Sequence, residues 1–188
     1  CQWAKDFYEL DEGDIHAAYC NFAFDVSIGE LLAPLMLGST VHIIHEDLRL
    51  SIRLLNDYLN RHRITIATLP PRVGGLFMEE ENRSLRLLTV CGEKLNYFKD
   101  QSYQIVNAYG PSEATIYATA FKVDKNYDNI PIGYPISNSW AYVVDSEGRL
   151  LPQGSAGELW LAGENIGSAY LNDQALTDKS FISNPFKS

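Results

Sequence analysis

The sequence has few cysteines, few basic residues and no long hydrophobic run. Its three cysteines, Cys1, Cys20 and Cys91, form no C-x-x-C pair, so neither a zinc cage nor a disulfide framework is indicated. Fifteen Lys and Arg against 24 Asp and Glu give a formal net charge of −9. This excess of acid argues against a nucleic-acid partner, because binding a phosphate backbone requires clustered positive charge. No apolar run approaches the roughly 18 to 20 residues that span a bilayer, so no membrane partner is expected.

The start of the sequence also lacks the basic and apolar regions of a secretory signal. Together with the unpaired cysteines, this favours a reducing cytoplasm as the location. The histidines do not indicate a metal site, because His42 and His45 lie three apart in a strand-like stretch and would point to opposite faces. The run of three glutamates at 79–81 is typical of a solvated loop.

What the sequence does have is an ordinary hydrophobic share, 46%, and an alternation of strand-like and helix-like segments over its first two thirds. We predict helices at 28–37, 51–62 and 93–101, with Asp25 or a nearby serine capping the first of them. The predicted strands lie at 15–22, 40–44, 64–69, 85–90 and 103–108. This alternation favours an α/β fold with a mostly parallel sheet flanked by helices, a flavodoxin-like subdomain.

The pattern changes after about residue 130, where residues 129–133 have the composition of a linker. Strands are predicted at 140–144 and 157–162, with a turn between them and no helix. That is typical of an antiparallel β hairpin or a piece of a barrel. We therefore expect two parts, an α/β subdomain over residues 1–130 and a partial β-barrel subdomain over residues 131–188.

Polar or glycine-bearing segments follow four of the predicted strands, at 24–25, 68–70, 91–93 and 107–110. In an open parallel sheet, ligands bind beyond the carboxyl ends of the strands. Four such ends at one edge predict a cleft for a small molecule, and this pattern does not name the ligand.

Four motifs in register resemble those of amino-acid adenylation domains from nonribosomal peptide synthetases. N-A-Y-G-P-S-E at 107–113 is similar to the family's N-x-Y-G-P-T-E, and F-D-V-S at 24–27 is similar to its F-D-x-S. I-G-Y-P-I at 132–136 with G-E-L at 157–159, and the stretch 177–186 with its N-P-F, resemble two segments further downstream. The resemblance covers essentially the whole chain, and it implies an adenylate-forming fold that activates an amino acid with ATP.

The resemblance implies that Asp25 pairs with the substrate's α-ammonium group, although a residue just before a helix also fits an N-cap. Charged side chains are absent from the rest of the implied pocket, which favours a neutral substrate, because an unpaired buried charge is costly. Thr68 together with Ala108 points to an aromatic substrate, and a branched aliphatic one is the rival. The alternative for Thr68, Thr89 and Cys91 is that they are ordinary residues at strand ends with no role in binding. The implied pocket residues are Asp25, Val26, Gly29, Thr68, Thr89, Cys91, Ala108, Ile116 and Tyr117.

The same resemblance implies part of an ATP site. Tyr109 would flank the adenine ring, Asn107 would bind the adenine edge, and Ser112 stands where the family has threonine. The implied nucleotide-binding residues are Gly92, Glu93, Asn107, Tyr109, Gly110 and Ser112, and Glu113 would be a ligand of Mg²⁺. In the downstream glycine motif, Asn165 and Ser168 replace the usual glycine and arginine, so no nucleotide contact is assigned to them.

Three family segments have no counterpart in the sequence: the Ser/Thr/Gly-rich phosphate loop, the Y-x-T-G-D segment and the C-terminal lobe with its catalytic lysine. The resemblance therefore implies an internal part of a larger synthetase, with no catalytic residue of its own and little activity alone. Its partners there would be a condensation domain and a carrier-protein domain with its phosphopantetheine thiol.

Two other functions remain open. An acyl- or aryl-acid ligase that uses coenzyme A shares the general fold, but it is not built to hold an ammonium group at Asp25. A non-catalytic nucleotide-binding module of flavodoxin-like topology would need a glycine-rich loop after the first strand. The chain has F-D-V-S at that place.

Overall fold

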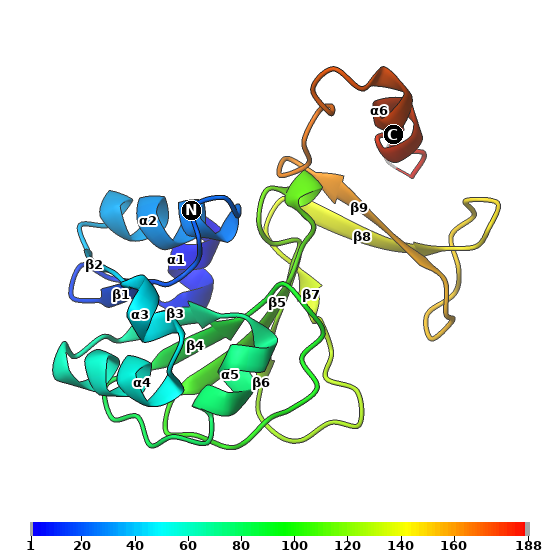
Figure 1. Cartoon of the computed structure of the whole chain (residues 1–188). Helices are drawn as coiled ribbons and strands as arrows, with labels where there is room; N and C mark the ends of the chain where they lie inside the picture. Colours follow the sequence, from blue (N-terminus) through cyan, green and yellow to red (C-terminus); the bar gives the residue numbers. More distant parts are fainter. Residues whose placement is uncertain (1, 187–188) are drawn as a thin grey trace.

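The chain folds around a seven-stranded mixed sheet, as seen in a computed structural model that describes residues 2–186 (Figure 1). Neighbours in the order β2-β1-β3-β4-β5 are parallel, and β6 and β7 are antiparallel additions at one edge. The parallel part has the strand order of flavodoxin, so the predicted α/β class is confirmed. The strands are β1 (Ile15–Ala18), β2 (Thr40–Ile43), β3 (Ile66–Leu69), β4 (Leu87–Val90), β5 (Gln104–Tyr109), β6 (Thr119–Val123) and β7 (Tyr134–Pro135).

Helices cover both faces of this sheet. α1 (Gln2–Tyr8) and α2 (Val26–Met36) lie on one face, while α4 (Ile52–Arg61) and α5 (Pro71–Phe77) lie on the other, with the short α3 (Glu46–Arg49) beside α4 (Figure 1). α4 matches its prediction closely. Its N-cap is Ser51, whose hydroxyl accepts a hydrogen bond from the Leu54 amide at 3.4 Å, and it buries Leu55 and Leu59.

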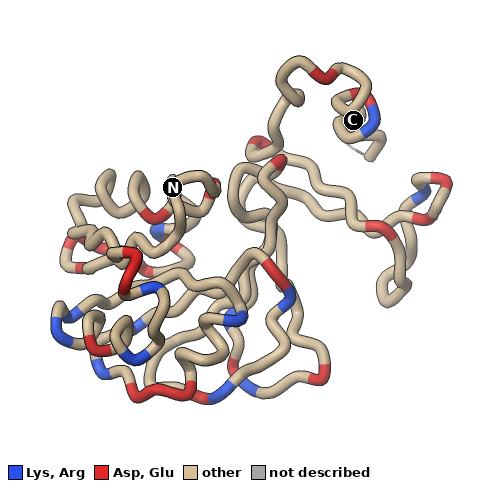
Figure 2. Tube along the Cα trace, in the orientation of Figure 1, with Lys and Arg blue, Asp and Glu red and all other residues tan. Residues whose placement is uncertain are grey.

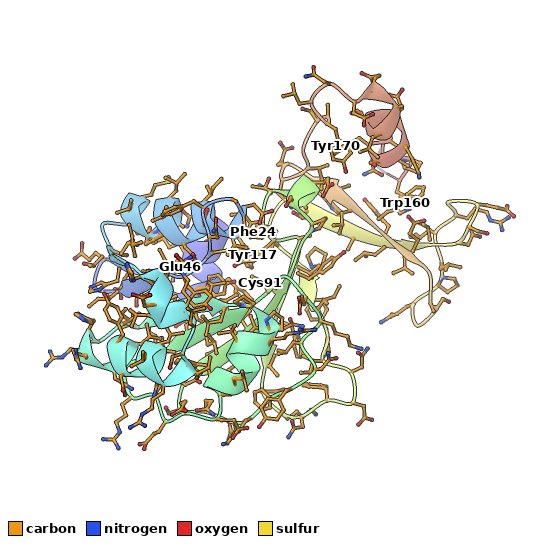
Figure 3. The ribbon with its side chains drawn as sticks, viewed as in Figure 1. Phe24, Glu46, Cys91, Tyr117, Trp160 and Tyr170 are labelled. Carbon is orange, nitrogen blue, oxygen red and sulfur yellow. The ribbon has the colours of Figure 1, made fainter. Side chains whose placement is uncertain are left out.

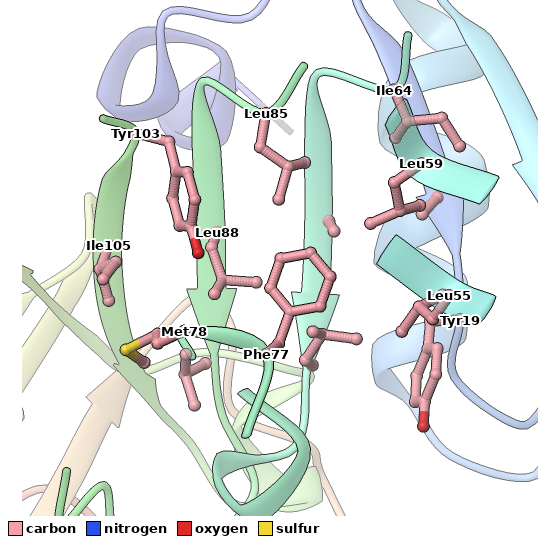
Figure 4. Packing of buried hydrophobic residues seen from close by; sticks show 14 of the residues in the cluster. Tyr19, Leu55, Leu59, Ile64, Phe77, Met78, Leu85, Leu88, Tyr103 and Ile105 are labelled. Atoms are coloured by element: carbon pink, nitrogen blue, oxygen red, sulfur yellow. The ribbon is translucent and has the colours of Figure 1, made fainter. Parts of the chain in front are cut away.

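The core consists of two hydrophobic clusters, one on each face of the sheet. The larger contains Phe77, Leu88 and Ile105 and lies under α4 and α5 (Figure 4). The smaller contains Tyr8 and Leu87 and lies under α1. Leu87 and Leu88 fall in different clusters because successive side chains of a strand point to opposite faces. The result is a three-layer arrangement.

An antiparallel hairpin of β8 (Ser139–Val144) and β9 (Glu158–Gly163) extends away from the sheet, and α6 (Gln174–Ser180) follows it (Figure 1). The hairpin predicted from the sequence is thereby confirmed. The pair β6–β7 keeps residues 134–135 on the large sheet. The division of the chain near residue 130 into two subdomains stays a prediction.

Two sequence-based expectations about local structure are wrong. The segment 93–101, predicted as a helix, has no helical residues. It is held instead by Leu95 and Phe98, which are buried in the larger cluster. His45 lies beyond the end of β2 and caps α3, so it does not share a strand with His42.

Charged side chains are dispersed. Segments of Lys and Arg lie interspersed with segments of Asp and Glu along the chain trace (Figure 2). Within residues 2–186, the helices are too short or too polar to cross a membrane.

Candidate functional site

The carboxyl ends of β1, β3, β4 and β5 meet at one edge of the sheet, because these strands are parallel. The segment after β1 contacts the 3₁₀ helix η1 (Ser112–Ala114) through Asp25 and Ser112, and Cys91 after β4 contacts Tyr117, which follows η1. Figure 3 shows Phe24, Cys91 and Tyr117 close to this edge. The strand ends named in the sequence analysis therefore lie at one edge of the sheet, and the ligand-binding role of their residues stays a prediction.

A cavity of about 250 Å³ lies between α2 and the sheet. Thr68 and Thr89 are paired neighbours on β3 and β4, so their side chains stand side by side on the wall. On the opposite side, a Cβ atom at Gly29 would lie 3.1 Å from Cδ1 of Ile116, so glycine at this position keeps the cavity open. The predicted pocket residues that line the cavity are Gly29, Thr68, Thr89, Ile116 and Tyr117.

The other predicted pocket residues lie outside this lining. Cys91 follows β4, and its Sγ lies 3.8 Å from the Tyr117 hydroxyl. Burial raises the pKa of the Cys91 thiol to about 12, so this thiol stays protonated and unreactive at neutral pH. Ala108 is buried within β5, and Val26 is the first residue of α2.

Asp25 directly precedes α2, yet its side chain caps none of the helix amides. Its carboxylate instead accepts a hydrogen bond from the Ser112 hydroxyl. The Asp25 side chain therefore does not cap α2. The contact brings together a residue implied in ammonium binding and one implied in nucleotide binding, from segments 87 residues apart.

A larger groove of about 940 Å³ begins at the carboxyl end of β5 and runs along β9. Tyr109, which is 38% exposed, and Glu113 line it, together with Pro111 and Trp160. Figure 3 shows Trp160 and Tyr170 on the hairpin side of the molecule.

The other residues implied in nucleotide binding are outside the lining of this groove. Asn107 is buried, and its side-chain amide donates to the Pro131 carbonyl at 2.8 Å. Glu93 is exposed and forms an ion pair with Arg72 at 3.7 Å. Gly92, with φ of 103°, makes the turn after β4. Gly110 is the turn residue where the chain leaves β5 for η1.

Glu113 is fixed from two directions. Its carboxylate accepts a hydrogen bond from the Tyr170 hydroxyl, which lowers the pKa of Glu113, and its carbonyl accepts from the Gly167 amide at 2.7 Å. Among the described residues, no group of three or more His, Cys, Asp and Glu could form a metal cage. Mg²⁺ is commonly held by one or two carboxylates, several waters and a substrate phosphate, so a single Glu113 fits a magnesium ion that arrives with a nucleotide.

Three polar residues of this region were missed by the sequence analysis. Glu30 lines the cavity from α2, its Oε2 accepts from the Cys20 amide at 2.8 Å, and burial raises its pKa to about 7. His16 lines the cavity from β1, and burial lowers its pKa to about 4. Asn165 lines it from the segment after β9. Of these three residues, Glu30 could have been noticed in the sequence, because it is an acidic residue within the apolar segment that forms α2.

The sequence matches the AMP-binding enzyme family over residues 1–171. It is 43% identical to bacitracin synthase 1 of Bacillus licheniformis over 99% of this chain and 4% of that protein. It is 38% identical to surfactin synthase subunit 1 of Bacillus subtilis (strain 168) over 99% of this chain and 5% of that protein. The chain thus spans about one twentieth of the length of these curated relatives.

Solved structures agree with this relationship. A crystal structure of a four-domain nonribosomal peptide synthetase bound to AMP and glycine superposes with a TM-score of 0.87 at 29% identity, over 98% of this chain and 14% of that one. The N-terminal subdomain of Klebsiella oxytoca NpsA, at 21% identity and a TM-score of 0.83, shares the fold over 95% of this chain and 47% of that one. The chain therefore belongs to the AMP-binding enzyme family and is homologous to the adenylation domains of nonribosomal peptide synthetases.

Proposed function

We propose that this chain forms the amino-acid pocket and part of the ATP site of an adenylation domain. In that reaction, a carboxylate oxygen of the amino acid attacks the α-phosphorus of ATP, and the bond to pyrophosphate breaks. The aminoacyl adenylate then reacts with the phosphopantetheine thiol of a carrier-protein domain, and AMP leaves. Together with a condensation domain, the carrier protein is the partner we propose for the intact synthetase.

The observation that carries this proposal is the contact between Asp25 and Ser112. An anion that can hold an ammonium group thereby lies beside a hydroxyl that can donate to a phosphate oxygen. With its ammonium group held at Asp25, the amino acid would direct its reacting carboxylate toward the groove that begins at Tyr109. Holding reactants in this way is a large part of how such enzymes lower the barrier.

For the substrate, we propose a neutral side chain, aromatic or branched aliphatic. The cavity wall is mostly apolar, and Gly29 leaves room opposite the paired threonines Thr68 and Thr89. Glu30 is the acidic residue in this lining, and burial favours its protonated, neutral form. To pair with a cationic side chain, Glu30 would first have to lose its proton and carry a charge in this buried place.

Glu113 would hold Mg²⁺ together with the nucleotide phosphates, and Tyr109 would offer a flat face to the adenine. When bound, Mg²⁺ supplies charge neutralisation at the phosphates. The family's phosphate loop and lysine are not in this sequence. We therefore propose that these 188 residues on their own are a poor catalyst, since they lack groups that stabilise the developing charge.

The test is a hybrid enzyme in which residues 1–188 replace the matching segment of a complete adenylation domain of a relative. ATP–pyrophosphate exchange is measured with amino acids and with the same acids lacking the amino group. We expect exchange with amino acids only, and its loss in Asp25→Ala. Equal exchange with the acids that lack the amino group, unchanged by Asp25→Ala, would instead favour an acyl- or aryl-acid ligase.

A further inference from the structure

We infer that Asn165 is a positioning residue that sets the shape of the amino-acid pocket. This inference rests on the proposed function and adds a residue to it. Asn165 follows β9, in the motif where the resembled family usually has glycine, and no role follows for it from that motif. Its side chain lies at the edge of the 250 Å³ cavity.

The side chain of Asn165 connects the hairpin to the loop formed by η1 and the residues that follow it, 112–118. Its Nδ2 donates to two carbonyl oxygens of that loop, Ala114 and Tyr117, at 3.2 Å each. Its Oδ1 accepts from the Ser139 hydroxyl of β8 at 2.7 Å. Both N–H groups of the side-chain amide thus donate to the loop, and the side-chain oxygen accepts from the hairpin.

The backbone of Asn165 adds a further contact, because its carbonyl accepts from the Thr115 hydroxyl at 2.7 Å. The loop bound in this way contains Ile116 and Tyr117, two of the residues that line the cavity. A glycine at position 165 could keep the backbone contact but would lose all three side-chain hydrogen bonds. The position of the cavity wall therefore depends on this asparagine side chain.

The nucleotide side of the same loop is held independently. Ser112 is bonded to Asp25, and Glu113 is bonded to Tyr170 and to the Gly167 amide. None of these contacts uses the Asn165 side chain. Loss of the asparagine should consequently disturb amino-acid binding more than nucleotide binding.

The experiment compares Asn165→Gly, Asn165→Asp and the wild-type hybrid enzyme by ATP–pyrophosphate exchange. Asn165→Asp keeps the oxygen that accepts from Ser139 but removes both donors to the loop. Asn126→Asp, at an exposed position outside the candidate site, controls for the added negative charge. We expect KM for the preferred amino acid to rise about tenfold in both Asn165 variants, because both lose the two hydrogen bonds to the loop, with KM for ATP changed less than about twofold.

We also expect the preference for that amino acid over the next best one to fall. This ratio does not depend on the fraction of folded enzyme, so general destabilisation would not change it. Equal increases in both KM values, or an unchanged preference, would overturn the inference.

Hydrogen exchange on the 188-residue chain gives a second test that needs no activity. In Asn165→Gly, the amides of residues 114–118 should exchange faster, while those of β3 and β4 stay as protected as in the wild type. Uniform or absent changes would contradict the positioning role. Since an inactive wild-type hybrid would count against the proposed function and leave this exchange pattern intact, the two failures are distinguishable.

Discussion

The ion pair between Asp14 and Arg86 ties the strand starts of the sheet to the end of α1. The Asp14 side chain is 4% exposed and accepts from Nε of Arg86 at 2.8 Å and from the Thr65 hydroxyl at 2.8 Å. Arg86 also donates to the Tyr8 carbonyl at 3.0 Å. Burial would raise the pKa of Asp14, but these hydrogen bonds and the positive charge outweigh it and lower the pKa.

Replacing Asp14 with alanine should destabilise the fold by about 2 to 3 kcal/mol, because it leaves Arg86 and Thr65 without their buried partner. This loss of stability is smaller than for a fully buried ion pair, because the Arg86 side chain is 38% exposed to solvent. Urea unfolding at neutral pH measures the loss, with Asp128→Ala at an exposed position as the control. Because the pKa is lowered in the fold, the stabilisation is present above the ordinary Asp range and is lost as the pH falls through the folded value.

Glu30 should make stability depend on pH in the opposite sense. Burial raises its pKa from 4.5 to about 7, so between these values the folded chain binds a proton that the unfolded chain has released. The free energy of unfolding then falls as the pH rises from about 4.5 to about 7, by about 3 kcal/mol at most. Glu30→Gln should remove this decline. The exposed variant Glu12→Gln should keep it, and identical pH profiles for both variants would show that Glu30 titrates normally.

Single residues of the site were partly predictable. Asp25, Ser112 and Glu113 stand in recognisable motifs, so the sequence could name them as candidates. Their partners were not predictable, since the Asp25–Ser112 contact joins positions 87 residues apart and exists only after the sheet has formed. The role of Asn165 was hidden for the same reason, since its partners in the loop, Ala114 and Tyr117, lie 51 and 48 residues earlier in the chain.

At the scale of elements, the turn from β5 into η1 determines where the site residues lie. A Cβ atom at Gly110 would come within 2.5 Å of the Ile116 carbonyl oxygen and 2.8 Å of the Ala118 nitrogen. Both are backbone atoms, which cannot move aside as a flexible side chain can. Glycine at position 110 is therefore required for the close approach of the two ends of this loop.

We expect Gly110→Ala to destabilise the chain by at least about 2 kcal/mol and to abolish exchange activity in the hybrid. Gly75→Ala is the matched control, because its Cβ would lie 3.7 Å from Tyr97 in ordinary contact. This change within α5 should be neutral or stabilising by up to about 1 kcal/mol. Wild-type stability and activity in Gly110→Ala would show that the loop tolerates a different path.

Helices and strands were predicted well where the hydrophobic pattern was regular. They were predicted poorly where tertiary contacts determine the local conformation. α4 has a serine cap and a strong apolar stripe, so its ends were close to those observed. The segment 93–101 has helix-compatible polar residues, yet burial of Leu95 and Phe98 holds it in an irregular path. The helix α5 was not among the predicted helices. It begins at Pro71, and proline is favoured at the first position of a helix.

At the scale of the whole molecule, the parallel sheet and the hairpin contribute different parts of the site. The sheet edge supplies the cavity, while the hairpin and the segment after it hold the loop that closes the cavity, through Asn165 and Gly167. The change in pattern after residue 130 indicated the hairpin, but it could not indicate that the hairpin contacts the predicted pocket. That contact is a property of the folded chain.

The central claim is that these 188 residues contain the amino-acid pocket. The most direct test is the profile of ATP–pyrophosphate exchange by the hybrid enzyme across all proteinogenic amino acids, compared with the profile of its host. We predict that the hybrid prefers a different, neutral amino acid, aromatic or branched aliphatic. An active hybrid that keeps the host's preference would contradict the account, because selection would then lie outside this chain.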